Sequence, residues 1–157
     1  MEIQLICIGK TDDSNLQKLI LNYENRLKYY IKFTPQVILD IKDSKKLTQE
    51  QQKTKEAELI EKQIRNSDVV VLLDENGNEF SSLGFSEFLN KKMSSGIKRL
   101  IFIIGGPYGF AKSLHLKYKV KISLSQMTFS HQMIRLFFVE QLYRANTILK
   151  NEPYHNR

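Results

Sequence analysis

"LIFIIGGPYGF", residues 100–110, joins five apolar residues to a loop that holds three glycines and a proline. A short, continuous apolar run is typical of a strand that is buried on both faces of a parallel sheet. The loop after it has few side chains, so a ligand can approach its backbone. We therefore expect Gly105 and Gly106 to lie at a ligand site on the carboxyl edge of a sheet.

Outward from this stretch, short apolar runs alternate with helical patterns. Strands are expected at 2–8, 35–41, 69–73, 99–104 and 120–124, and helices at 14–30, 48–65, 81–94 and 131–149. Ser14 is expected to cap the first helix, and Thr48 with Gln51 fits a capping box. The polar segment 42–58 fits either an exposed helix with a loop or a mobile insertion. The alternation predicts an α/β fold: residues 1–157 form a single domain with a mostly parallel sheet flanked by helices.

The last predicted helix, 131–149, is apolar nearly all round, because Leu136 to Val139 are four apolar residues in a row. A helix on the surface of a small domain normally needs one apolar stripe. Either this helix is central or one of its faces meets another subunit, and the second interpretation predicts a homodimer. Glu140 and Arg144 are spaced to form an ion pair along the helix.

Positive charge is concentrated in the last third of the chain. Residues 1–109 have a net charge of +1 and residues 110–157 a net charge of +6. This distribution fits either a solvated basic surface or a site for a polyanion such as RNA. The single cysteine, Cys7, lies in an apolar run and excludes an internal disulfide. With no signal-peptide pattern and no apolar stretch long enough for a membrane span, a cytoplasmic protein is expected.

Familiar ligand motifs do not fit the glycine loop. "GPYGFAKS" (106–113) is close to the P-loop pattern, but Ala111 replaces its second glycine and Pro107 removes an amide donor. The glycine spacing also breaks the dinucleotide fingerprint, the histidines are too dispersed for a metal site, and the G-x-S-x-G elbow of hydrolases is missing. Three strand ends, at Leu73, Gly105 and Leu124, are expected to converge on a flat, modestly charged cofactor.

Several segments resemble the RlmH family of SPOUT-class methyltransferases, which methylate N3 of a pseudouridine in large-subunit ribosomal RNA. The similar segments are "IQLICIGK", "VVVLLDENGNEFSS", "IIGGPYGF", "SLSQMTFSHQMIRLFFVEQLYRA" and "PYHNR". The resemblance implies S-adenosylmethionine as methyl donor, a homodimer, no metal, and a trefoil knot at the C-terminal end of the sheet. It implies these donor-binding residues: Leu73, Gly105, Leu124, Ser125, Gln126, Met127, Thr128 and Phe129. Ser130 departs from the family, which often has proline there.

The resemblance also directs attention to the C-terminal third. The N3 proton of the substrate must leave before methylation, either to a base or because nearby positive charge lowers its pKa. The candidate catalytic residues are His131, Arg135, Tyr154 and His155. The candidate RNA contacts are Arg135, Arg144, Tyr154, His155 and Arg157. Asp74 and Glu75 are expected in a polar turn around Asn76 and Gly77. The alternative function is a non-catalytic RNA- or ribosome-binding module.

Overall fold

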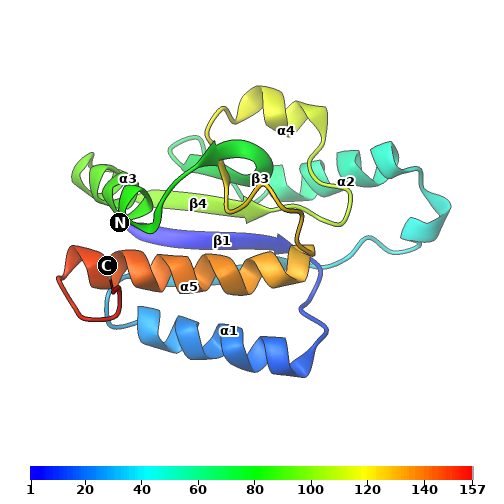
Figure 1. The fold of residues 1–157 in the computed structure, drawn as a ribbon. Helices are drawn as coiled ribbons and strands as arrows, with labels where there is room; N and C mark the ends of the chain where they lie inside the picture. The colour runs from blue at the N-terminus through cyan, green and yellow to red at the C-terminus, as the bar shows by residue number, and fades with distance from the viewer. Residues whose placement is uncertain (157) are drawn as a thin grey trace.

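The computed structural model describes residues 1–156 and confirms an α/β fold (Figure 1). Five strands form one sheet in the order β2-β1-β4-β3-β5, and every pair is parallel. The strands are β1 (Glu2–Ile8), β2 (Lys32–Ile38), β3 (Val69–Glu79), β4 (Arg99–Ile104) and β5 (Lys121–Ser123). The helices are α1 (Ser14–Leu27), the 3-10 helix η1 (Ser44–Lys46), α2 (Gln49–Glu61), α3 (Ser82–Ser94), α4 (Lys112–Lys117) and α5 (His131–Leu149).

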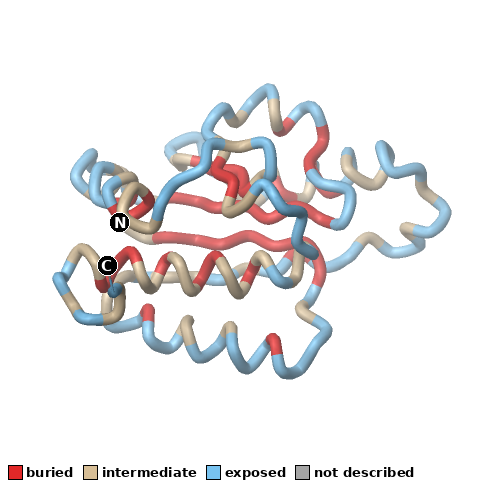
Figure 2. Tube along the Cα trace, viewed as in Figure 1, coloured by how far each residue is buried: buried red, intermediate tan, exposed pale blue. Residues whose placement is uncertain are grey.

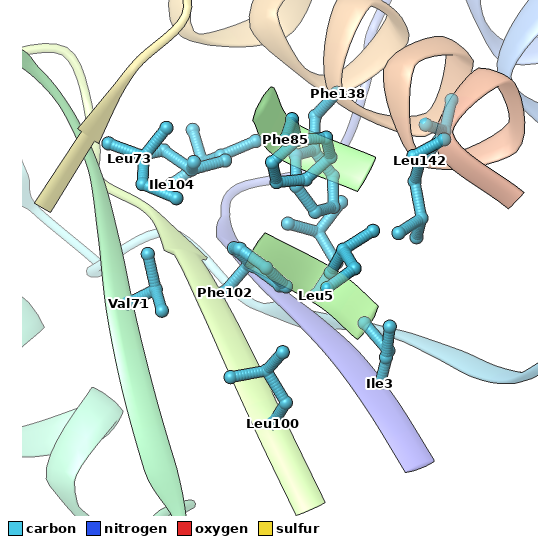
Figure 3. Packing of buried hydrophobic residues seen from close by; sticks show 14 of the residues in the cluster. Ile3, Leu5, Val71, Leu73, Phe85, Leu100, Phe102, Ile104, Phe138 and Leu142 are labelled. Atoms are coloured by element: carbon cyan, nitrogen blue, oxygen red, sulfur yellow. The ribbon is translucent and has the colours of Figure 1, made fainter. Parts of the chain in front are cut away.

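Helices cover both faces of the sheet, which explains the continuous apolar runs. Side chains alternate along a strand, so Leu100, Phe102 and Ile104 of β4 pack with α1, α3 and α5 (Figure 3). Ile101 and Ile103 point to the other face and pack with α2 and α4. The buried residues in Figure 2 follow the central strands accordingly.

Helix α5 is central in its layer, because it packs between α1 and α3. Phe138, Val139 and Leu142 are buried in the core, and the Phe138 ring lies 4.7 Å from that of Phe102 (Figure 3). This position accounts for part of the apolar surface of α5, whereas Met133, Leu136 and Phe137 stay partly exposed. The expected ion pair is present, since Arg144 Nη2 lies 2.5 Å from Glu140 Oε1.

Several predicted boundaries shift. Strand β2 begins at Lys32 rather than at Pro35, since a proline is tolerated within a strand at the edge of a sheet. The cap of α1 is Asp13, whose side chain accepts from Leu16 N, and not Ser14. The capping box of Thr48 and Gln51 is confirmed. Helix α4 was not predicted, because six residues leave too little periodicity to recognise.

Strand β3 also continues beyond the predicted end at residue 73. Asp74 and Glu75 lie in an irregular part of β3, after which Asn78 and Glu79 pair with β5. The expected polar turn around Asn76 and Gly77 is therefore a bulged continuation of the strand. A Cβ atom on Gly77 would lie 2.7 Å from the backbone of Ile122, so glycine allows β5 to approach.

The remaining expectations concern the cysteine, membrane spans and the knot. Cys7 is buried, and burial raises the pKa of its thiol to about 11. The helices within residues 1–156 are all too short or too polar to cross a membrane. The C-terminal trefoil knot stays a prediction.

Candidate methyl-donor pocket

A pocket of about 770 Å³ lies at the carboxyl edge of the sheet, where β3, β4 and β5 end. Its lining includes these residues expected at a donor site: Leu73, Gly105, Leu124, Ser125, Met127, Thr128 and Phe129. Gln126 is not in the lining, since its side chain donates to Glu79 Oε2 at 3.2 Å. The structure thus brings three separate chain segments together at one cavity, as expected from their positions at strand ends.

The glycine loop after β4 closes on itself. Gly109 N donates to Gly106 O at 3.1 Å, and Gly109 has a φ of 75°, which favours glycine. A Cβ on Gly105 would lie 3.2 Å from the Gly109 carbonyl carbon and 3.3 Å from the Phe110 ring. A Cβ atom at Gly105 would thus require the loop or the Phe110 ring to shift by a few tenths of an ångström, and the pocket wall there is main chain.

The segment after β5 is shaped by short polar side chains. Ser125 Oγ accepts from Met127 N at 2.9 Å, and Thr128 Oγ1 donates to Glu75 Oε2 at 2.8 Å. Ser130, at the position where the resembling family often has proline, caps α5 by accepting from Met133 N at 3.2 Å. These bonds hold the segment across the pocket mouth and begin α5 directly at His131.

The pocket has an apolar floor and a small set of polar groups. Leu73, Ile104, Ile122, Leu124 and Ile134 form the apolar part. The titratable side chains in the lining are Lys53, Asp74, Glu75, Tyr108, His115 and His131. Sequence reasoning missed Lys53, Tyr108 and His115, because α2, the glycine loop and α4 meet here only in three dimensions.

His131 is half-buried in the pocket wall. Burial lowers the pKa of its imidazole, and the positive charge of Arg135 lowers it further. A histidine whose pKa lies below its usual value is neutral at neutral pH and can accept a proton. His131 is therefore the predicted site residue whose position and protonation state fit a base.

Arg135 is not available to RNA or to a ligand in this structure. Its side chain is 3% exposed, donates to Ile8 O at 2.6 Å and to Thr11 Oγ1 at 3.0 Å, and lies outside the pocket lining. Arg135 thus fastens the end of β1 to α5. The sequence predicted an RNA contact from residue type, which does not reveal that α5 turns this position inward.

Tyr154 and His155 follow the C-terminal end of α5 and contact the middle and C-terminal half of that helix, whereas His131 is its first residue. Tyr154 Oη donates to Glu140 Oε1 at 3.0 Å, and its ring packs on Tyr143. Nδ1 of His155 lies 3.4 Å from Arg144 Nη1. Glu140 and Arg144 lie nine and 13 residues after His131, ~14 and ~20 Å along the helix, and neither Tyr154 nor His155 lines the pocket. Arg157 lies outside the described residues.

Comparison with known proteins identifies the family. A family model described as "Predicted SPOUT methyltransferase" matches residues 1–155. The chain belongs to the SPOUT methyltransferase family. It is 61% identical over 157 residues to "Ribosomal RNA large subunit methyltransferase H" of Christiangramia forsetii, and 62% identical over 157 residues to the protein so named from Flavobacterium psychrophilum; each alignment covers 100% of both chains. These matches confirm the resemblance seen in the sequence.

Within residues 1–156, no group of three or more His, Cys, Asp or Glu side chains is placed to hold a metal ion. The polar side chains that line the pocket at the carboxyl edge are instead spread singly among apolar residues. Such a lining suits an organic ligand with a flat apolar part and a few polar groups.

Proposed function

We propose that the chain transfers a methyl group from S-adenosylmethionine to N3 of a pseudouridine in large-subunit ribosomal RNA. The observation that carries this proposal is the single cavity formed by the three strand ends, in a chain of the SPOUT methyltransferase family. The names of full-length relatives that are about 60% identical support ribosomal RNA as the substrate. A net charge of +7 favours a polyanionic partner, and such a substrate places the protein in the cytoplasm.

The pocket residues fit this donor on the evidence of their shape and chemistry. Main chain at Gly105 and Gly106 offers hydrogen-bonding groups without side chains, which suits the edge of an adenine. Leu73, Leu124 and Ile134 offer apolar surface for its faces. When bound, the donor supplies an activated methyl group on a sulfonium. The chain has to hold this group, exclude water and orient the acceptor, which can contribute up to ~7–11 kcal/mol.

The residues of the chain must also handle the N3 proton of the acceptor. His131 fits the role of the base, because its lowered pKa leaves the imidazole neutral. Tyr154 does not fit that role. Burial and hydrogen bonds with Tyr23 and Glu140 raise the pKa of its hydroxyl, so it stays a hydrogen-bond donor. We assign proton acceptance to His131 and RNA contacts to Tyr154, His155 and Arg144.

A homodimer would bring the two sets of residues together. Half-exposed aromatic and apolar side chains lie beside the pocket: Phe80, Phe129, Met133 and Phe137. Three of them, Phe80, Phe129 and Phe137, line a second hollow of about 510 Å³ that adjoins the donor pocket. We propose that a second copy covers this surface with its α5 antiparallel to the first. The tail of each copy then approaches the pocket of the other.

The experiment is methylation of ribosomes from cells that lack this protein. Purified protein and S-adenosylmethionine carrying a labelled methyl group are added, and the modified nucleotide is located by mass mapping of the ribosomal RNA. One methyl group on N3 of a single pseudouridine supports the proposal. Calorimetry without magnesium tests donor binding separately. A protein that binds ribosomes but neither binds the donor nor methylates is the non-catalytic module instead.

A further inference from the structure

Asp74 and His115 meet in the wall of the pocket although they come from different elements, the irregular middle of β3 and helix α4. His115 Nε2 lies 3.6 Å from Asp74 Oδ2. Asp74 Oδ1 accepts from Asn76 N at 2.8 Å, so the bulge in β3 fixes the carboxylate. The side chain of Asp74 is 11% exposed. Neither residue has a role in the reaction described so far.

The orientation of His115 follows from its other ring nitrogen. Nδ1 is buried and has no hydrogen-bond partner within the described residues, and the ring stands edge-on to Phe110. Leaving a buried N–H without an acceptor costs more free energy than leaving the lone pair of a buried ring nitrogen without a donor. The proton of a neutral His115 therefore belongs on Nε2, which faces Asp74. In this tautomer the imidazole directs a positive dipole at the carboxylate and holds it in place.

Asp74 is also the charged group of the lining that lacks a strong partner. Lys53 Nζ is 2.6 Å from Glu50, and the exposed Glu75 accepts from Thr128. No lysine or arginine nitrogen within residues 1–156 forms an ion pair with Asp74. A carboxylate that is poorly solvated and unpaired attracts a cation more strongly than one in water does.

We infer that Asp74 recognises the positive charge of the methyl donor and that His115 is the residue that positions it. This inference rests on the proposed function. S-adenosylmethionine carries a sulfonium, whereas its product, S-adenosylhomocysteine, has lost that charge with the methyl group. A carboxylate in the wall favours the donor over the product. Asp74 thus helps the spent product to leave the pocket.

The test compares the affinities of donor and product by calorimetry for the wild-type protein and Asp74→Asn. Asparagine keeps the acceptor for Asn76 N and removes only the charge. We expect donor affinity to fall at least about tenfold and product affinity to change less than about threefold. Sinefungin, which carries an ammonium group in place of the sulfonium, should follow the donor. His115→Gln, which keeps a donor group, should preserve the donor-to-product ratio better than His115→Phe.

Glu75→Gln is the matched control, since it removes the same charge from a neighbouring, exposed carboxylate that solvent screens. It should alter the ratio by less than Asp74→Asn does. Equal losses for donor and product in Asp74→Asn, or an equal change of the ratio in Glu75→Gln, overturns the inference while the proposed function stands. A wild-type protein that binds neither compound overturns both.

Discussion

The two edges of the sheet are built differently. At the amino edge, polar groups are paired: Arg99 Nε and Nη2 donate to the carboxylate of Asp68 at 2.9 and 2.5 Å, and Nη2 also donates to Gln63 O. At the carboxyl edge, Asp74 accepts from Asn76 N at 2.8 Å and faces His115 at 3.6 Å, but no lysine or arginine within residues 1–156 pairs with it. Polar groups without partners cost stability. The carboxylate without a guanidinium or ammonium partner, Asp74, lies in the pocket, whereas the paired carboxylate, Asp68, lies at the opposite edge, and this contrast separates ligand-binding from stabilising structure.

The C-terminal tail is the exception to this contrast. It lies at the amino edge, where Tyr154 and Glu152 pair with residues of α1, α5 and the segment before β2. Its residue types nevertheless fit RNA, since an aromatic ring can stack on a base and an imidazole can contact phosphate. Substitutions at each edge and removal of the tail test whether the paired edge supports the fold and the pocket edge supports ligand binding.

The largest effect is expected at the carboxyl edge, from Gly105→Val. Its Cβ alone would be crowded against the Gly109 backbone and the Phe110 ring, and two further methyl groups add to this, so the loop must change its shape at the pocket wall. Donor affinity should fall at least 100-fold, a loss of ~2.7 kcal/mol, measured by calorimetry.

Gly84→Ala is the control, because this glycine lies in α3 and an added Cβ meets only ordinary contacts of 3.4 Å or more. It should leave donor affinity unchanged. If a folded Gly105→Val protein binds the donor as the wild type does, the glycine loop is not part of the site.

The next effect is expected at the amino edge, from Asp68→Asn. Burial of Asp68 opposes its charged form, but hydrogen bonds from Arg99 and from Arg65 N outweigh it and hold the pKa below its usual value. A carboxyl group with a lowered pKa stabilises the fold above its unfolded pKa, and this stabilisation is lost as the pH falls through the folded pKa. Denaturant unfolding at neutral pH should show a loss of ~2 kcal/mol.

Donor affinity should not change in Asp68→Asn, which separates this edge from the pocket. Asp43→Asn is the matched control, since its ion pair with Lys46 is exposed and 3.9 Å long, and asparagine tolerates the left-handed backbone at this position. It should have little effect. An Asp68→Asn protein that loses donor binding without losing stability contradicts the division between the edges.

Removal of residues 153–157 tests whether the C-terminal tail acts in methylation although it lies at the amino edge. Methylation of ribosomes should fall at least tenfold, ~1.4 kcal/mol of transition-state stabilisation, while donor affinity stays the same. An ordinary chain terminus frays and tolerates truncation. The contacts of Tyr154 with Glu140 and Tyr143 instead predict a loss of ~1 kcal/mol in unfolding free energy.

His155→Ala is the sharper variant, since it keeps the Tyr154 contacts and should lose part of the activity without the loss of stability. Sedimentation of the intact protein should give about twice 18.4 kDa if a partner chain presents the tail to the pocket. Full methylation by the truncated protein would show that the tail only stabilises the amino edge.

Local signals explain how much of this molecule could be predicted from the sequence. The bounds of β1, β4 and α5 agree with the structure, because a run of apolar residues or a long periodic pattern determines each. The sequence also predicted that positions Leu73, Gly105 and Leu124 meet, and they line one cavity, because the carboxyl ends of parallel strands lie at the same edge of a sheet.

The rest depended on which side of an element faces inward. Arg135 looked like an RNA contact, yet its burial is decided by the packing of α5 between α1 and α3. His115 attracted no attention as a site residue, since the short helix α4 is visible only after folding. Gly77 marked a turn by residue type, whereas the close approach of β5 is the reason for the glycine.

The smallest effect is expected from Glu56→Gln. This variant should increase the unfolding free energy, whereas Asp68→Asn should decrease it. Glu56 of α2 is 4% exposed at the carboxyl edge, where its oxygens lie 2.7 and 2.8 Å from the position of a Cβ on Gly106. Burial raises the pKa of its carboxyl group, and the charge of Asp40 raises it further, although Gln52 donates a hydrogen bond. Such a group binds its proton more tightly in the folded state than in the unfolded state.

Stability therefore decreases as the pH rises from the unfolded pKa of Glu56 through its folded pKa, which is opposite to the behaviour of Asp68. At neutral pH the buried charge of Glu56 opposes folding. Glutamine keeps the acceptor for Gln52 and removes the charge, so Glu56→Gln should increase the unfolding free energy by ~0.5–1 kcal/mol. Urea unfolding of Glu56→Gln and Asp68→Asn between about pH 4 and 8 measures both changes in unfolding free energy and shows whether their signs are opposite. If Glu56→Gln destabilises the protein at neutral pH as Asp68→Asn does, both edges hold their carboxylates equally well, and the pocket edge has not given up stability for ligand binding.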